Sequence, residues 1–192
     1  MTKNELRAIY KAKRSALSLK EMDKLNDLIL IHFQKIPLPF IACVHTYLAS
    51  LRLAEPDTAH IIRYLQFKNP DVLVAVPRVD LSLNTMQHIH MSDNVELIKN
   101  SYGIEEPSAG NNIEPEDIDL VMVPLLAFDK AGFRVGYGKG FYDRFLKECK
   151  PGVVKIGLSF FDAEDSISDI NELDVPLDYC VTPHQLYPFA HS

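Results

Sequence analysis

The opening of the chain has the hydrophobic spacing of two amphipathic helices. Apolar side chains fall near one helical face over 3–17, and the pattern repeats over 20–35. Pro37 and Pro39 then interrupt the helical pattern. The run IACVHTYL at 41–48 has the length and composition of a buried strand. The first 48 residues therefore predict two helices followed by a strand.

The remainder alternates between strand-like and helix-like segments. Strands are predicted over 72–77, 86–91, 119–124 and 154–160, and helices over 59–68, capped by Asp57 and Thr58, and after Gly140. This alternation predicts an α/β fold of three layers, a mostly parallel sheet flanked by helices. The turn-rich segment 103–115 is predicted to be an exposed connection within one domain that spans 1–192.

Composition restricts the classes of function. The chain has 192 residues, 47% of them hydrophobic, and a formal net charge of -6, which argues against a general nucleic-acid binder. The chain has an odd number of cysteines, and their spacing does not match a zinc site; they are Cys43, Cys149 and Cys180. This pattern is typical of reduced thiols. No apolar run approaches the roughly 20 residues of a membrane span. We expect a cytoplasmic protein with no membrane or nucleic-acid partner, and a monomer.

The first 20 residues leave one alternative for the N-terminus. They hold six Lys or Arg residues against the single acid Glu5, a balance also found in mitochondrial presequences. The segment is poor in serine and continues directly into the first predicted helix. These features favour a structural helix.

A glycine-rich loop carries the first chemical signal. Gly136, Gly138 and Gly140 alternate after a predicted strand and before a predicted helix, and Arg134 and Lys139 lie beside them. Glycines let backbone N–H groups approach a phosphate, and a helix N-terminus adds partial positive charge. The loop therefore favours a nucleotide ligand. The alternative is a simple turn with two solvated basic residues, since the pattern matches neither a Walker loop nor the dinucleotide fingerprint.

The surrounding residues connect this loop to a known family. The run RVGYGKGFYD at 134–143 resembles the signature of the 5-formyltetrahydrofolate cyclo-ligase family, within the broader pattern VPGxAFDxxGxRLGxGxGYYDxxL. KNELR at 3–7, YLASLRLAEPDT at 47–58, VPRV and GIEEP are also similar to family segments. The chain departs from the pattern at Leu125, Val135 and Phe141, and the stretch from Leu48 to Glu55 is slightly longer than in many relatives.

The resemblance implies a reaction and a nucleotide site. Members of the family use ATP and Mg²⁺ to convert 5-formyltetrahydrofolate to 5,10-methenyltetrahydrofolate. Arg134 and Lys139 match the catalytic cations beside the transferring phosphoryl group. The ATP-binding residues implied by the resemblance are Lys3, Asn4, Glu5, Leu6, Arg7, Arg134, Val135, Gly136, Tyr137, Gly138, Lys139, Gly140, Phe141 and Tyr142. Lys11 and Arg14 continue the Lys3–Arg7 helical stripe, but a solvated basic face is the default interpretation for them.

The resemblance also implies metal and folate ligands. Asp143 and Asp174 match magnesium carboxylates, although Asp178 is an alternative to Asp174, and Asp143 alone also fits a helix-stabilising acid. Glu55 is either a pterin ligand or a surface or capping acid. The implied substrate-binding residues are Leu48, Glu55, Tyr137, Gly138, Lys139, Gly140 and Phe141.

Two features remain to be weighed against this interpretation. The histidines at 45, 60, 88 and 90 offer no third partner for a metal, so surface histidines are predicted. Two other functions stay open: a binding or regulatory protein related to this family, which holds a nucleotide or folate without turnover, and a sugar-phosphate isomerase or acyl-transfer enzyme on a similar scaffold. Basic nucleotide motifs at both ends of the chain favour the ligase.

Overall fold

A seven-stranded sheet forms the centre of the molecule, a computed structural model that describes residues 1–92, 94–100, 103 and 105–190. The strand order is β11-β10-β9-β6-β1-β2-β3. The four inner pairings are parallel and the two edge pairings antiparallel. The strands are β1 (Cys43–His45), β2 (Leu73–Asp80), β3 (Thr85–His90), β6 (Leu120–Val123), β9 (Val154–Leu158), β10 (Tyr179–Val181) and β11 (Leu186–Pro188).

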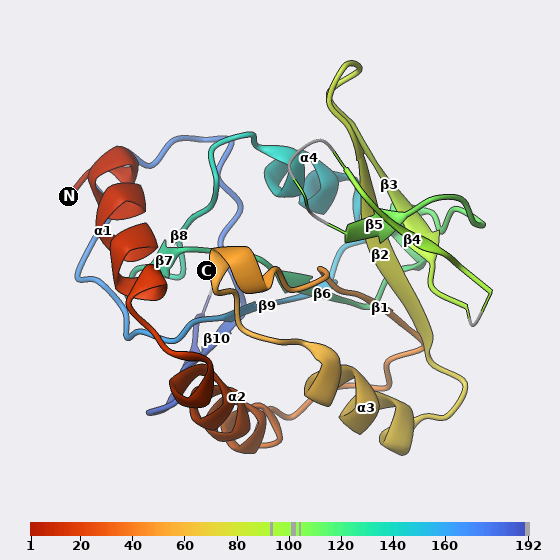
Figure 1. The fold of residues 1–192 in the computed structure, drawn as a ribbon, viewed down its shortest axis with the longest axis horizontal. Helices are drawn as coiled ribbons and strands as arrows, with labels where there is room; N and C mark the ends of the chain where they lie inside the picture. The colour runs from red at the N-terminus through yellow and green to blue at the C-terminus, as the bar shows by residue number, and fades with distance from the viewer. Residues whose placement is uncertain (93, 101–102, 104, 191–192) are drawn as a thin grey trace.

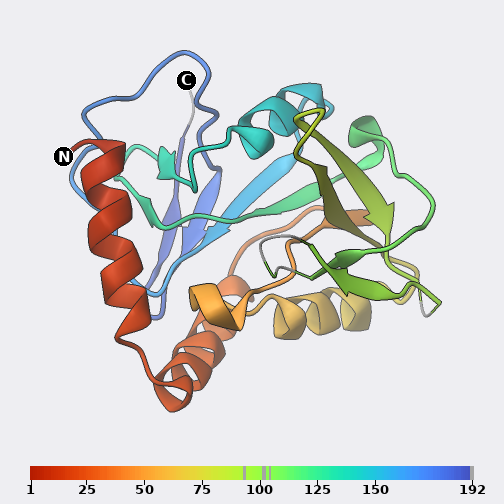
Figure 2. The same ribbon diagram turned by 45° about the horizontal axis from the view of Figure 1, so that its top comes forward.

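Helices cover both faces of this sheet, which confirms the predicted α/β fold. α2 (Leu19–Phe33) and α3 (Ala59–Lys68) lie along one side, α4 (Phe141–Glu148) lies on the other, and α1 (Lys3–Ser15) stands at one end (Figures 1 and 2). Capping boxes at Thr2 and Ser18 begin α1 and α2 by satisfying backbone N–H groups that have no helical partner. Within the described residues, no helix combines the length and apolar composition needed to span a bilayer.

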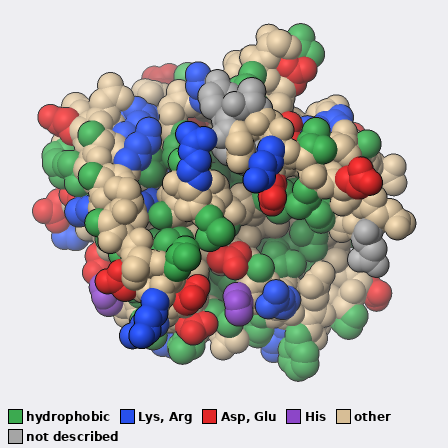
Figure 3. All heavy atoms as spheres, viewed as in Figure 1, with side chains coloured by type: hydrophobic (Ala, Val, Ile, Leu, Met, Phe, Trp, Pro, Cys, Tyr) green, Lys and Arg blue, Asp and Glu red, His purple; other side chains and the backbone are tan. Residues whose placement is uncertain are grey.

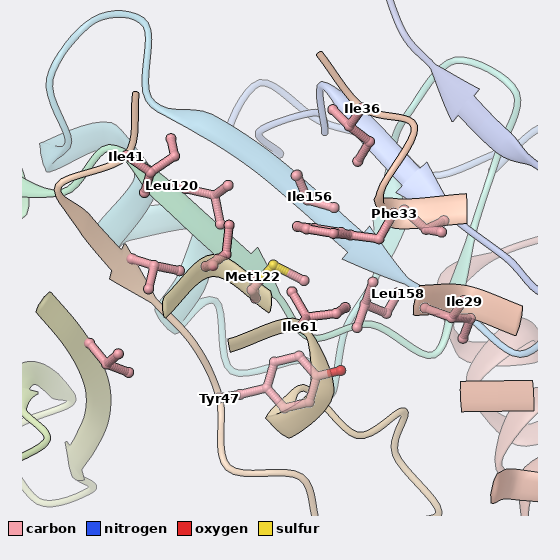
Figure 4. Close-up of a cluster of buried hydrophobic side chains, with 14 of the residues drawn as sticks. Ile29, Phe33, Ile36, Ile41, Tyr47, Ile61, Leu120, Met122, Ile156 and Leu158 are labelled. Atoms are coloured by element: carbon pink, nitrogen blue, oxygen red, sulfur yellow. The ribbon is translucent and has the colours of Figure 1, made fainter. Parts of the chain in front are cut away.

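Strand β6 shows how both faces are buried. Leu120 and Met122 belong to the core under α2 and α3, whereas Val121 and Val123 belong to the core under α4. Successive strand residues point to opposite faces, so an entirely apolar strand is needed between two helical layers. Figure 4 shows the first of these clusters, in which Leu120, Met122 and Ile156 meet the helices. Each such side chain stabilises the fold by roughly 1.5–3 kcal/mol through burial.

Short elements account for the differences from the predicted boundaries. The strand predicted over 41–48 is only Cys43–His45, because after Thr46 the chain leaves the sheet. The segment 103–115 is not wholly a connection, since β5 (Glu105–Pro107) pairs with β4 (Leu97–Lys99); residue 104 of the GIEEP motif lies outside the described residues. The remaining elements are η1 (Leu51–Leu53), η2 (Pro115–Asp117), β7 (Ala127–Phe128) and β8 (Arg134–Val135).

The prediction of surface histidines is wrong for two of the four. His60 is exposed and His90 half-buried, but His45 and His88 are buried. The ring of His88 stacks on Phe145 of α4 at a centroid distance of 3.9 Å. Burial lowers the pKa of His88 to about 4 and that of His45 well below its ordinary value. Both rings are therefore neutral packing elements whose cover, α4, comes from a distant part of the sequence.

Candidate active site

A cavity of about 880 Å³ opens at the carboxyl ends of β1 and β6. Tyr47 and Leu48, which follow β1, and Pro124, which follows β6, line it. The chain proceeds from β1 to β2 on one side, and β6 returns to the other side of β1. This reversal of strand order is the place where open α/β sheets bind ligands, because the connecting loops diverge there.

The predicted glycine loop forms one wall of this cavity. It connects β8 to α4, with Gly138 at φ +93° and Gly140 at φ +69° as the residue that caps α4. These backbone conformations favour glycine. Arg7 of α1 donates from Nε to the Gly136 carbonyl at 2.9 Å, and it also contacts Asn4. The loop is therefore held against α1 beside the cavity.

The basic stripe of α1 faces the same cavity. Lys3, Arg7 and Lys11 line it, as the helical spacing of Lys3 and Arg7 predicts. Figure 3 shows Lys and Arg side chains gathered across the upper half of this face, between α1 and the β2–β3 hairpin. The solvated alternative for Arg14 is excluded, because only 2% of this residue is exposed. Three cations of α1 therefore line the cavity, and the last cation of the helix, Arg14, is buried.

Two ion pairs join the predicted cations to the predicted metal carboxylates. Lys3 Nζ lies 2.5 Å from Asp174 Oδ2, and Arg134 Nη2 lies 2.8 Å from Asp143 Oδ1. Val175, the residue after Asp174, binds the second pair through its backbone: its N–H donates to Asp143 at 3.1 Å and its carbonyl accepts from Arg134. All four charged residues line the cavity. The cations were predicted to bind phosphate and the carboxylates to bind a metal. In this structure the two kinds of group form ion pairs with each other.

The alternative metal ligand, Asp178, lies elsewhere. It forms an ion pair with Lys155 at 2.8 Å, accepts from the Lys155 backbone at 2.7 Å, and is not part of the cavity lining. The geometry therefore favours Asp174 over Asp178 as the partner of Asp143.

The two predicted catalytic cations differ in environment. Arg134 has only 5% of its side chain exposed, and burial lowers the pKa of its guanidinium although Asp143 acts in the opposite direction. Lys139 is exposed at the cavity wall and belongs to none of the ion pairs found among the described residues. Arg134 is thus fixed in place, whereas the Lys139 ammonium can reorient toward a ligand.

Glu55 is not a surface acid. The residue is 9% exposed, lines the cavity, and accepts the Ser50 N–H at 2.9 Å and the Tyr137 hydroxyl at 2.7 Å. Nearby, Tyr142 also lines the cavity, and its buried hydroxyl has no partner among the described residues. Burial raises the pKa of Tyr142 well above its ordinary value, so the hydroxyl keeps its proton. The site thus combines a fixed acceptor with an unused donor.

Four residues of the implied ATP set do not line the cavity. Leu6 and Val135 are fully buried in the core between α1 and the β7–β8 hairpin. Glu5 completes the cap of α1, and Asn4 accepts from Arg7. Sequence reasoning also missed several lining residues, because no local pattern shows that η1, the far turn of α4 and the segment before Asp174 reach the site. Charged or polar examples are Arg52, Arg144, Lys147 and Asn171.

The donor set is compatible with Mg²⁺ delivered together with phosphate. Asp143 and Asp174 offer hard oxygen ligands, which suit this ion. Within the described residues, no group of three or more His, Cys, Asp or Glu side chains is placed to hold a metal. Two carboxylates leave most of an octahedral shell to phosphate oxygens and water, as magnesium commonly requires.

The fold and the cavity together define an α/β protein with a cleft lined by cations and carboxylates at its topological switch point. Comparison with known proteins identifies the family: residues 1–183 match the model of the 5-formyltetrahydrofolate cyclo-ligase family, and the chain belongs to it. The predicted family and enzyme class are thereby confirmed, and the isomerase or acyl-transfer alternative does not correspond to the matching family.

Individual relatives agree with this assignment. A 5-formyltetrahydrofolate cyclo-ligase of Mycoplasma pneumoniae is 30% identical over 94% of this chain and 98% of its own length. The mitochondrial 5-formyltetrahydrofolate cyclo-ligase of Arabidopsis thaliana is 32% identical over 75% of this chain, which spans 60% of that relative. The structure of Aquifex aeolicus 5,10-methenyltetrahydrofolate synthetase superposes with a TM-score of 0.81 at 28% identity, covering 100% of this chain and 95% of the other.

Proposed function

We propose that this chain closes 5-formyltetrahydrofolate to 5,10-methenyltetrahydrofolate with consumption of ATP and Mg²⁺. The observation that carries the proposal is the meeting of Lys3, Arg134, Asp143 and Asp174 beside the glycine loop of one cavity. Such a mixture of charges suits a metal–polyphosphate complex, because the cations can bind phosphate oxygens and the carboxylates can bind the metal ion. Family membership supplies the substrate class.

The chemistry requires activation of a poor leaving group. The formyl oxygen attacks the γ-phosphorus and ADP departs; N10 then attacks the activated carbon, loses its proton, and the phosphorylated oxygen leaves as phosphate. Mg²⁺, when bound, neutralises phosphate charge. Arg134 and Lys139 stabilise the charge that develops on the transferring group, and the loop aligns the reactants.

The folate is assigned to the end of the cavity that holds Glu55. Its carboxylate is fixed by Ser50 and Tyr137, which suits the donor-rich edge of a pterin. The buried hydroxyl of Tyr142, which has no hydrogen-bond partner among the described residues, lies within electrostatic range of both Glu55 and Arg134. Monomeric state and cytoplasmic location remain predictions from the sequence.

Single-turnover absorbance tests the function. Purified protein mixed with 5-formyltetrahydrofolate and Mg-ATP should generate the near-ultraviolet absorbance of the conjugated methenyl product and an equal amount of ADP. Omitting ATP or Mg²⁺ should remove both signals. Arg134→Met should abolish turnover, whereas Lys130→Met, at an exposed ion pair outside the cavity, should not. Folded protein that yields neither product refutes the proposal.

A further inference from the structure

Arg14 is a buried cation that the reaction outlined above does not use. It lies in the last turn of α1, is 2% exposed, and is not part of the cavity lining. Its Nη1 donates to the Tyr137 hydroxyl at 3.2 Å and its Nη2 donates to the Leu125 carbonyl, while Nε has no partner among the described residues. A buried guanidinium with incomplete pairing is costly, and an apolar side chain would fill the space more favourably. Packing alone does not explain this residue.

The contacts of Arg14 continue into the cavity. The Tyr137 hydroxyl accepts from Arg14 and donates to Glu55 Oε1 at 2.7 Å, and Glu55 Oε2 accepts from Ser50. Burial, reinforced by Glu55, raises the pKa of Tyr137 well above its ordinary value, so the hydroxyl retains its single proton. Because Arg14 can only donate, that proton is directed to Glu55. The order of donors and acceptors is thus set from the Arg14 end.

We propose that Arg14 is a positioning residue for folate recognition, acting through Tyr137 to hold the Glu55 carboxylate in the orientation that binds the pterin edge. The inference rests on the proposed function. Each Glu55 oxygen already accepts one protein hydrogen bond, which fixes the plane of the carboxylate. The remaining lone pairs can then meet two N–H donors of a planar heterocycle without the cost of ordering the side chain.

The competing explanation is a structural one. Arg14 also contacts the Leu125 carbonyl, and by this bond it attaches α1 to the segment after β6. A purely structural Arg14 would affect stability and would weaken folate and ATP binding together. A positioning Arg14 affects folate binding selectively, because ATP is assigned to Lys3, Arg7 and the glycine loop.

Calorimetric titration of 5-formyltetrahydrofolate and of Mg-ATP separates the two explanations. Arg14→Met should weaken folate binding by about tenfold, the size expected for losing a charged hydrogen bond that orders a ligand group. Mg-ATP affinity should change less than twofold, and KM for the folate should rise more than kcat falls. Arg14→Lys, which keeps a donor for Tyr137, should recover part of the loss. The matched control is Lys13→Met, which removes an exposed cation from the same turn.

A double-variant cycle completes the test. In a Tyr137→Phe background the relay is already broken, so Arg14→Met should cause little additional loss of folate affinity. An Arg14→Met penalty of the same size in both backgrounds would overturn the proposal, as would a lowered melting temperature with parental folate affinity. If Arg14→Met does not fold, Arg14→Lys with and without Tyr137→Phe gives the same cycle. A parent protein that binds no folate refutes the proposed function itself.

Discussion

Replacing Asp174 by Asn should strengthen the binding of metal-free ATP while weakening the binding of Mg-ATP. In the structure the Asp174 carboxylate holds the Lys3 ammonium at 2.5 and 2.7 Å, so a phosphate must displace it to reach that cation. Asn keeps the shape and can still accept from the Asn171 N–H, which donates to Asp174 at 2.7 Å. The substitution removes a competitor for Lys3 and a like charge near the phosphates.

The magnitude follows from the burial of the pair. The Lys3 and Asp174 side chains are 13% and 16% exposed, so the pair is intermediate between a surface and a buried ion pair. Surface pairs contribute up to about 1 kcal/mol, whereas breaking a buried pair costs about 3–5 kcal/mol. An intermediate value of about 1–1.5 kcal/mol corresponds to a roughly five- to twelvefold tighter dissociation constant for ATP without metal. With Mg²⁺ the sign reverses, because a carboxylate assigned to the metal is lost.

Titrations of ATP in the presence of a chelator and in excess Mg²⁺ measure both effects. Asp169→Asn is the matched control: this exposed carboxylate accepts from the Lys3 backbone N–H at 2.7 Å, so its loss leaves the ammonium paired. It should alter neither affinity by more than twofold. Equal weakening of both forms by Asp174→Asn, or no change in either, would show that the ion pair does not compete with the nucleotide.

Three further outcomes are expected. Lys139→Ala should leave the melting temperature unchanged and lower kcat about 10²–10³-fold, because its ammonium is exposed and assigned to the transferring phosphoryl group; parental kcat would remove it from the mechanism. Gly138→Ala, at φ +93° and with its Cβ 3.4 Å from the Arg7 guanidinium, should destabilise the fold by about 1–2 kcal/mol in denaturant titrations, unlike Gly136→Ala, whose Cβ meets nothing within 4 Å. Equal stability of the two would contradict the backbone argument. His88 is neutral when folded, with a pKa of about 4 against about 6.5 unfolded, so its contribution is complete above pH 6.5 and is lost as the pH falls toward 4. Between pH 7 and 5 the parent should lose roughly 1–2 kcal/mol more stability than His88→Phe, and exposed His60→Phe should behave as the parent.

Periodicity predicted the fold because its signals are local. Both α1 and α2 begin at capping boxes, and the apolar run of β6 indicates a strand buried on both faces. The β4–β5 and β7–β8 pairs were missed because each of these strands has only two or three residues, too few to show an alternation of apolar and polar positions. The strand predicted over 41–48 was longer than the observed Cys43–His45, because Tyr47 after it is buried in the core without pairing in the sheet.

The site was less accessible to sequence reasoning than the fold. The glycine loop and its basic neighbours form a continuous motif, so their convergence was predictable. The burial of Arg14 was not, because its acceptors are the Leu125 carbonyl and the hydroxyl of Tyr137, more than a hundred positions away. Similarly, the pairing of Lys3 with Asp174 depends on tertiary placement that no local pattern encodes.

The contact between the start of α1 and the segment 168–174 has a consequence for synthesis. The Met1 carbonyl accepts a hydrogen bond from the Ser168 N–H, and Lys3 donates to Asp169 and Asp174. Each contact joins residues more than 160 positions apart. A nascent chain therefore presents α1 with the Lys3 ammonium lacking this partner until residue 174 has been synthesised. Since domains emerge N-terminus first, the part of the cavity lined by Lys3 and Asp174 is assembled late. Incomplete chains that stop before 168 would carry the glycine loop but not the carboxylate that neutralises Lys3.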